Sequence, residues 1–269
     1  MKIRYKSDRM INSLRNFFDN ASRVSAALGD AAVATLYPGA CRVCGAMIES
    51  WRDGMACPAC WHEVEREADD FCAKCWSPLV RAPRAETGAR ACGRCDHFAF
   101  DVVRSCGPYR GAMRETVLRL KLTPHIPPRL RGALRRAFDA LPDSDLIDSI
   151  IPTPLHPERL AERGFNQAEV IARELAALTG LRVDSTAVIR VKKTERHRAG
   201  MGARDRARSL EKAFRVRAPR LVSGRVALLV DDVMTTGSTA DEIARALLDG
   251  AARGVKVLTL ARAMNEFSV

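Results

Sequence analysis

One stretch of the 269-residue chain decides its fold, and it reads VALLVDDVMTTGST over residues 226–239. The residues from Val226 to Val230 are all apolar, which is typical of a strand that is buried on both faces of a parallel sheet. Two carboxylates, Asp231 and Asp232, come next, followed by a Thr/Gly/Ser loop and a predicted helix over 238–248. Because ligands bind at the carboxyl ends of strands in open parallel sheets, the sequence predicts a binding site at this point.

The residue types in this stretch suit a sugar phosphate. A loop of Gly, Thr and Ser that opens a helix offers backbone N–H groups and hydroxyls to a phosphate, and the helix dipole assists. Gly237 permits a close approach of the backbone to the ligand. Adjacent carboxylates can accept hydrogen bonds from the two hydroxyls of a ribose. The alternative is an ordinary strand, turn and helix, in which these residues only cap the helix.

Strands and helices alternate around this stretch. Strands are predicted at 102–106, 148–152, 187–191, 226–230 and 255–261, and helices at 112–122, 128–141, 158–178 and 238–248. This alternation predicts an α/β fold with a mainly parallel sheet and helices on both faces. We expect three parts: an amphipathic helix or tail over 1–36, a cysteine-rich region over 37–100 and the α/β domain over 101–269, with separate cores.

Eight of the nine cysteines form four Cys-x-x-Cys pairs. The pairs are Cys41 with Cys44, Cys57 with Cys60, Cys72 with Cys75, and Cys92 with Cys95. Two such turns complete a tetrahedral thiolate shell, so the pattern predicts two structural zinc ions with these eight ligands. Sequential sharing of the pairs keeps the loops short, but interleaved sharing is also open. The alternatives are disulfides, which need an oxidising compartment, or a redox pair. Cys106, the ninth, is expected to be a small core residue.

Charge is concentrated in one segment of this chain, whose net charge is +12. Residues 190–217 hold eleven lysines and arginines against three carboxylates, a net charge of +8. Such a segment favours a polyanionic ligand, the alternative being a solvated charged helix.

No apolar run is long enough to span a membrane, and the basic N-terminus lacks the features of a signal peptide, so we expect a cytoplasmic protein. The aromatic residues near the cysteines either stack on bases or pack around the metal: Trp51, Trp61, Phe71 and Trp76.

The order of strand, Asp-Asp, Thr-Thr-Gly-Ser-Thr and helix resembles the fingerprint of type I phosphoribosyltransferases. The resemblance implies that Asp231 and Asp232 contact the ribose 2′ and 3′ hydroxyls of phosphoribosyl pyrophosphate, which binds together with Mg²⁺. It also implies which residues surround the 5′-phosphate: Thr235, Thr236, Gly237, Ser238 and Thr239.

A longer part of the chain, about 36–264, resembles the ComF family of competence-associated proteins, in which a double zinc ribbon precedes a phosphoribosyltransferase domain. The matching residues are Tyr37-Pro38, the four cysteine pairs, Tyr109, Gly111, Lys121, Pro152-x-Pro154-Leu155, Arg159 and the run Arg163-Gly164-Phe165-Asn166-Gln167. Arg159 and Arg163 lie four residues apart, so they project from one helix face and could bind a diphosphate. The basic segment departs from the family pattern, with His197 or Arg198 in place of a Gln and Ser209 in place of an Asn.

The expected function is binding of phosphoribosyl pyrophosphate and Mg²⁺ in a protein that acts in the uptake or processing of single-stranded DNA. Single-stranded DNA and DNA-uptake proteins are the macromolecular partners that the resemblance implies. One alternative is an active phosphoribosyltransferase of nucleotide metabolism, which would transfer the pentosyl group. Another is a regulatory protein that senses the sugar phosphate without turning it over. The residues identify no acceptor pocket and no catalytic acid or base.

Overall fold

The computed structural model describes residues 39–48, 50–66, 71–79, 92–93, 95–192, 210 and 212–264. Two predictions lie outside these residues. One is the amphipathic helix over 10–36, and the other is most of the basic segment, including His197, Arg198 and Ser209.

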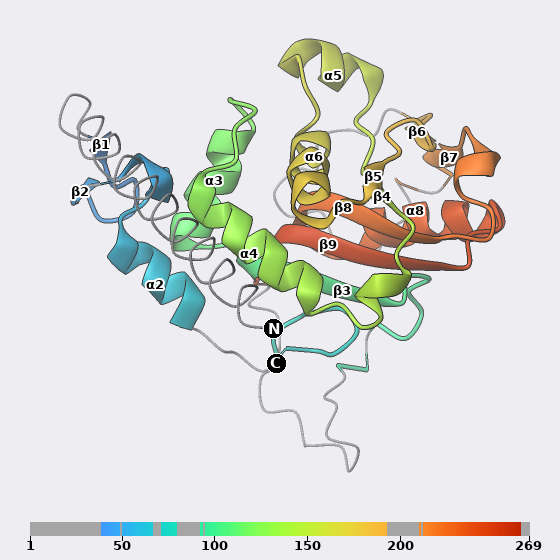
Figure 1. Cartoon of the computed structure of the whole chain (residues 1–269), viewed down its shortest axis with the longest axis horizontal. Coiled ribbons are helices and arrows are strands. Elements are labelled where there is room, and N and C mark those ends of the chain that lie inside the picture. The colour runs from blue at the N-terminus through green and yellow to red at the C-terminus, as the bar shows by residue number, and fades with distance from the viewer. Residues whose placement is uncertain are drawn as a thin grey trace, which may run out of the picture.

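A five-stranded sheet forms the centre of the molecule (Figure 1). Its strands, in spatial order, are β3 (Val102–Pro108), β9 (Gly254–Arg262), β8 (Val226–Met234), β4 (Ser149–Pro152) and β5 (Arg182–Val183). Every neighbouring pair is parallel. The predicted parallel α/β sheet is therefore confirmed.

Helices cover both faces of the sheet, as the alternation predicted. One face packs against α3 (Gly111–Leu120), α4 (Pro128–Asp139) and α6 (Gln167–Thr179), and the other against α8 (Ser238–Asp249). Successive side chains of β8 point to opposite faces, so Leu228 lies in the first core and Leu229 in the second. Both are fully buried, which explains why this strand has no polar residue before Asp231.

Two predicted elements differ from the structure. The single helix over 158–178 is two helices, α5 (Pro157–Arg163) and α6. Gly164 ends α5 in the left-handed region at φ 79°, and the side chain of Asn166 caps α6 by accepting a hydrogen bond from the amide of Ala168. Figure 1 shows α5 raised above the rest of the domain on the two connecting segments.

The strand predicted at 187–191 does not join the main sheet. It forms β6 (Val188–Arg190), which pairs antiparallel with β7 (Phe214–Val216). The two strands flank the basic segment in the sequence, so they bring its two ends together. The strands of a hairpin are recognised from sequence when a short turn joins them, whereas here residues 191–213 separate β6 from β7.

The cysteine-rich region begins with β1 (Gly39–Ala40) and β2 (Met47–Ile48), an antiparallel pair, followed by α2 (Pro58–Arg66). Short 3-10 turns lie at Trp51–Asp53, Ser144–Leu146 and Pro219–Leu221. The expectation of separate cores was wrong. Cys41, Cys57 and Cys60 share a core with α3, α4 and α6, whereas Cys72, Cys75 and Cys95 share the core of the α8 face. Among the residues described, no helix has the length and apolarity needed to cross a bilayer.

Candidate functional site

Asp231 and Asp232 lie on a strand that is longer than predicted. Strand β8 continues past Val230 to Met234, because β9 continues beside it: Asp231 pairs with Thr259, and Met234 pairs with Arg262. Backbone amides hold one oxygen of each carboxylate. Asp231 Oδ1 accepts from the amide of Asp232 at 2.8 Å, and Asp232 Oδ1 accepts from the amide of Val233 at 2.7 Å. The two carboxylates are therefore fixed in orientation at the carboxyl end of the sheet.

The electrostatics of this pair are unfavourable without a cation. Burial and, next, the negative charge of Asp232 together raise the pKa of Asp231 to about 8. Lys121, at the end of α3, offsets part of this effect: its Nζ lies 3.6 Å from Asp232 Oδ2. A single ammonium group leaves two adjacent carboxylates undercompensated, which is the setting in which a divalent cation binds.

The loop after β8 has the geometry of an anion site. Gly237 occupies the N-cap position of α8 with φ 89°, a conformation that an L side chain rarely adopts. The hydroxyls of Thr236 and Ser238 lie 2.9 Å apart, and the amide of Ser238 also approaches Thr236 Oγ1 at 3.4 Å. Hydroxyls and amides therefore gather at the start of a twelve-residue helix, where an anion is favoured.

Helix α5 carries the two predicted arginines on its less exposed side. Arg159 and Arg163 are half-buried, whereas the neighbouring Glu158, Leu160 and Glu162 are exposed. The placement agrees with the predicted shared helix face.

A third arginine, Arg190 at the end of β6, responds to the charges of the same site. Burial lowers the pKa of Arg190, Arg159 lowers it further, and the negative charge of Asp231 raises it. Its guanidinium also stands over the ring of Phe214, 5.4 Å from the centroid. From the sequence, Arg190 was identified only as the first residue of the basic segment, although its position at the end of a predicted strand could have indicated a role at the site.

The segment between β4 and α6 joins this site to the sheet. The amide of Thr153 donates to Val230 O at 2.8 Å, and Asn166 Nδ2 donates to Thr153 O at 3.0 Å. Two buried polar atoms nearby, Thr153 Oγ1 and Gln167 Nε2, have no hydrogen-bond partner among the residues described. Buried polar groups are rarely left in this state, so both are available to a ligand or to water.

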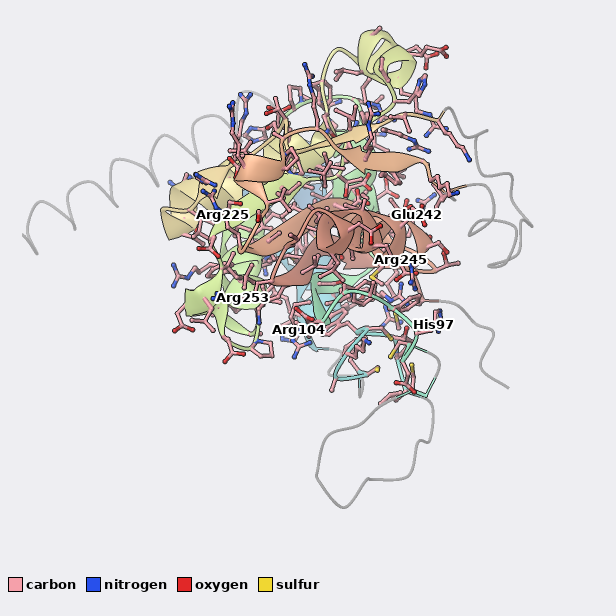
Figure 2. All side chains as sticks on the ribbon, turned by 90° about the vertical axis from the view of Figure 1, so that its right-hand side faces the viewer. His97, Arg104, Arg225, Glu242, Arg245 and Arg253 are labelled. Carbon is pink, nitrogen blue, oxygen red and sulfur yellow. The ribbon has the colours of Figure 1, made fainter. Side chains whose placement is uncertain are left out.

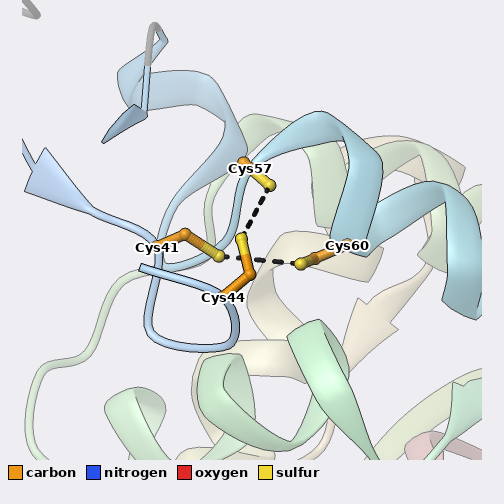
Figure 3. Close-up of side chains that lie close together, drawn as sticks. All are labelled: Cys41, Cys44, Cys57 and Cys60. Carbon is orange, nitrogen blue, oxygen red and sulfur yellow. Dashed lines mark hydrogen bonds between the residues drawn. The ribbon is translucent and has the colours of Figure 1, made fainter. Parts of the chain in front are cut away.

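The first cysteine cluster is formed by Cys41, Cys44, Cys57 and Cys60 (Figure 3). Cys41 Sγ lies 3.8 Å from Cys60 Sγ, and Cys44 Sγ lies 3.6 Å from Cys57 Sγ. The amide of Val43 donates to Cys41 Sγ at 3.4 Å, a contact that favours a thiolate. A closed set of four sulfurs fits a structural zinc ion, since it leaves no position for a substrate.

The second cysteine cluster is formed by Cys72, Cys75, Cys92 and Cys95. The hydrogen bond with Cys75 makes the largest contribution to the lowered pKa of Cys72, about 4, and backbone amides lower it further. In both clusters the four sulfurs lie within 4.8 Å of one another, and the structure groups the pairs sequentially. Both donor sets are therefore compatible with structural zinc.

The remaining cysteine and the aromatic residues are structural. Cys106 lies in β3 against the core, and burial raises its pKa to about 12. The rings of Phe71 and Trp76 stack on each other at 3.9 Å, and Trp61 is buried, with its Nε1 donating to Asp53 O at 2.8 Å. These three rings pack within the cysteine-rich region rather than forming a row for bases. The side chain of Trp51 is not among those that the structure describes.

Two family models match this chain. A double zinc ribbon domain matches residues 32–96, and a phosphoribosyl transferase domain matches residues 160–266. The second match contains Arg163, both aspartates and the whole phosphate loop.

Several curated proteins are similar to this chain. A DNA utilization protein YhgH of Salmonella typhimurium is 33% identical over 84% of this chain and 98% of the relative. A YhgH protein of Escherichia coli O6:H1 is 43% identical over 44% of this chain, a match that spans about half (51%) of that relative. Competence protein F of Haemophilus influenzae is 30% identical over 83% of this chain and 96% of its own length.

Among solved structures, a glutamine phosphoribosylpyrophosphate amidotransferase from B. subtilis is 17% identical, with a TM-score of 0.32 over 50% of this chain and 28% of that chain. A likeness of that size supports no argument about function.

Proposed function

The chain belongs to the ComF family of competence and DNA-utilisation proteins, and from that premise we propose that it binds phosphoribosyl pyrophosphate with Mg²⁺ at Asp231 and Asp232. One observation carries the proposal. Two adjacent, oriented carboxylates lie in the last half of a parallel strand, and the loop that follows this strand opens a helix at a left-handed glycine. Carboxylates suit a ribose diol and Mg²⁺, and the helix start suits the phosphate.

The basic residues support the pyrophosphate end of this ligand. The positive charge of Arg159 adds to burial in lowering the pKa of Arg190, and such like charges are tolerated when an anion binds between them. Mg²⁺, when bound, would neutralise negative charge on the ligand's pyrophosphate. The residues of the chain then orient the ligand: the phosphate loop binds one end, Asp231 and Asp232 the ribose, and the arginines the other end.

We infer that the site also supports transfer of the phosphoribosyl group. In such a transfer the bond between C1′ and pyrophosphate breaks, a bond from an acceptor to C1′ forms, and pyrophosphate departs with its electron pair. The positive charges of Arg159 and Arg190 would stabilise the departing anion. Neither the sequence nor the described residues place a general acid or base for an acceptor, so the acceptor brings its own nucleophile.

A role with single-stranded DNA is supported by a second region. The relatives carry names of DNA utilisation and competence. Five arginines lie on or beside β7 and at the starts of β8 and β9: Arg215, Arg217, Arg220, Arg225 and Arg253. Within the part of the chain that the structure describes, none of them forms an ion pair with a carboxylate. Arg217 and Arg220 line a surface cavity of about 510 Å³, and Figure 2 shows Arg225 and Arg253 on one side of the molecule.

Two measurements test these functions. Calorimetry with phosphoribosyl pyrophosphate and Mg²⁺ should show binding by the wild type and none by Asp231→Asn/Asp232→Asn; equal binding by both would reject the ribose assignment. A pyrophosphate-release screen of nucleobases and amines then separates transfer from binding alone. Binding without release in every case would leave the sensor function.

The DNA role is tested by salt dependence. Affinity for a single-stranded oligonucleotide should fall with salt, and the slope should drop by about 2 in Arg217→Gln/Arg220→Gln/Arg225→Gln, about 0.7 for each phosphate contact. No binding by the wild type at low salt would reject this role and leave the sugar-phosphate site unaffected.

A further inference from the structure

We propose that Arg262 is a positioning residue that joins the phosphate loop to the second cysteine cluster, so that the conformation of the loop depends on that cluster. The identity of the ligand that the loop binds, phosphoribosyl pyrophosphate, rests on the proposed function. The connection between cluster and loop rests on contacts that are independent of any ligand.

Arg262 is the last residue of β9, and only 5% of it is exposed. Its Nη1 donates to Met234 O at 3.0 Å and also to Thr235 O, the two carbonyls at the start of the phosphate loop. Its Nη2 donates to Ser77 Oγ at 2.6 Å. One buried guanidinium therefore binds the loop and the cysteine-rich region at the same time. Its planar, fixed array of donors suits this task better than a lysine ammonium would.

Ser77 is part of the second cysteine cluster's turn. Its hydroxyl oxygen lies 3.3 Å from Cys75 Sγ, and its carbonyl accepts from the amide of Cys72 at 2.8 Å. A change in the arrangement of these two cysteines moves Ser77, and with it a hydrogen-bond partner of Arg262. The path from the cluster to the loop thus consists of two side chains in direct contact.

The contacts of Arg262 also decide where the loop amides point. In a trans peptide the carbonyl and the following N–H point in opposite directions. The carbonyl of Met234 is held by the amide of Ala263 at 2.8 Å as well as by Arg262, and the carbonyl of Thr235 by Arg262, so the amides of Thr235 and Thr236 face away from Arg262. An anion at the start of α8 needs such amides in a fixed direction. Arg262 therefore supplies orientation to the loop without touching the ligand.

A second set of contacts holds the same two regions together. A side chain at Gly237 would meet the ring of Phe98 at 3.0 Å, so the loop packs directly on this residue. The amide of Ala99 donates to Asp241 Oδ1 at 2.7 Å, and Arg245 Nη2 donates to His97 O at 2.9 Å. Figure 2 shows His97 near Arg245. The segment after Cys95 is thus attached to the first two turns of α8, which fixes the cluster relative to the loop.

The test compares Arg262→Met, Arg262→Lys and Ser77→Ala with the wild type and with Arg173→Met, an exposed arginine on α6 that pairs with Glu169. Amide hydrogen exchange is measured across the full chain. Arg262→Met should raise exchange in peptides covering 234–239 by about tenfold or more, and Ser77→Ala by about threefold, as expected for loss of charge-assisted hydrogen bonds. Arg262→Lys should restore part of the protection, and Arg173→Met should leave the loop unchanged.

Affinity for phosphoribosyl pyrophosphate with Mg²⁺ gives the second readout, with an expected loss of about tenfold in Arg262→Met. Unchanged exchange in 234–239 in folded Arg262→Met and Ser77→Ala, or a rise spread evenly over the sheet, would overturn the proposal. If Arg262→Met does not fold, hydrogen exchange in 234–239 of Ser77→Ala decides whether the proposal stands. If the wild type binds no sugar phosphate but the loop exchange changes as expected, the proposed function fails and the connection stands.

Discussion

The two cysteine clusters have the same donor set and opposite surroundings. The first packs with α2 against α3 and α4, on the helical face that lies at the left of Figure 1. The second shares its core with α8 and meets the phosphate loop through Phe98 and Ser77. Identical metal chemistry can therefore have different consequences, because the neighbours of a cluster decide what its loss disturbs.

Near each cluster, an arginine of the α/β domain bonds to the cysteine-rich region. Arg129 of α4 donates to Asp53 Oδ1 at 3.0 Å and to Glu65 Oε2 at 3.3 Å, and it lies 5.7 Å from the ring centroid of Trp61. Arg262 performs the corresponding role for the second cluster but also bonds to the phosphate loop. The first cluster is thus attached to a helix, and the second to the candidate site.

The largest difference should come from removing one ligand of each cluster. Wild-type protein should hold about two zinc ions, and Cys75→Ser and Cys57→Ser about one each. Cys75→Ser should lose sugar-phosphate affinity by about a hundredfold, because its cluster positions the loop. Cys57→Ser should lose thermal stability but retain affinity within about threefold. Metal analysis and calorimetry on the same samples check this, and equal losses of affinity in both variants would contradict it.

Gly237→Ala tests the contact between loop and cluster. The new Cβ would lie 2.8 Å from Met234 Cε and 3.0 Å from the Phe98 ring, at a backbone φ of 89°. We expect a loss of about 2–4 kcal/mol in the free energy of unfolding, the sum of backbone strain and overpacking. Gly224→Ala is the matched control: its φ is 71° and no atom lies within 4 Å, so only the backbone cost of about 1 kcal/mol applies. Equal losses of unfolding free energy in Gly237→Ala and Gly224→Ala, measured by urea unfolding, would show that Phe98 does not confine the loop.

Asp231→Asn tests the electrostatics of the site itself. The folded-state pKa of about 8 exceeds the ordinary value of 3.8, so the folded protein holds a proton that the unfolded chain has lost. The stability of the wild type should therefore fall as pH rises from about 4 to about 8 and level off above that. The Asn variant lacks this loss and should be more stable at pH 9 by about 1–2 kcal/mol, with a smaller difference at pH 5. A difference in unfolding free energy between wild type and variant that is the same at every pH would contradict the raised pKa.

Arg129→Met should have the smallest effect on the site. The loss of its two ion pairs and of its contact with Trp61 should cost about 1–2 kcal/mol of stability. Affinity for the sugar phosphate should stay at the wild-type level, in contrast to Arg262→Met. A loss of affinity in Arg129→Met comparable to that in Arg262→Met would remove the distinction between the two clusters.

Much of the α/β fold could be predicted from local pattern. The apolar run ahead of Asp231 and the alternation of strands and helices identified the parallel sheet, because those signals lie within single elements. The break between α5 and α6 was missed, although Gly164 and Asn166 are the residues that make it. A helical spacing of apolar residues on both sides of a short turn concealed that break.

The connection between regions could not be predicted in the same way. Arg262 and Ser77 are separated by 185 positions, and nothing near either residue indicates a partner so distant. The sequence also gave no reason to expect that the two cysteine clusters lie on opposite faces of one sheet. These contacts arise from the packing of distant segments, which the periodicity of any one segment does not encode.

The most direct test of the sugar-phosphate site is amide hydrogen exchange on the wild-type chain with and without phosphoribosyl pyrophosphate and Mg²⁺. We expect the ligand to slow exchange in peptides covering 231–239 and 157–166, and to leave peptides covering 41–60 unchanged. Absence of protection in 231–239 at saturating ligand, or protection confined to other segments, would contradict the assignment of Asp231, Asp232 and the phosphate loop as the binding site.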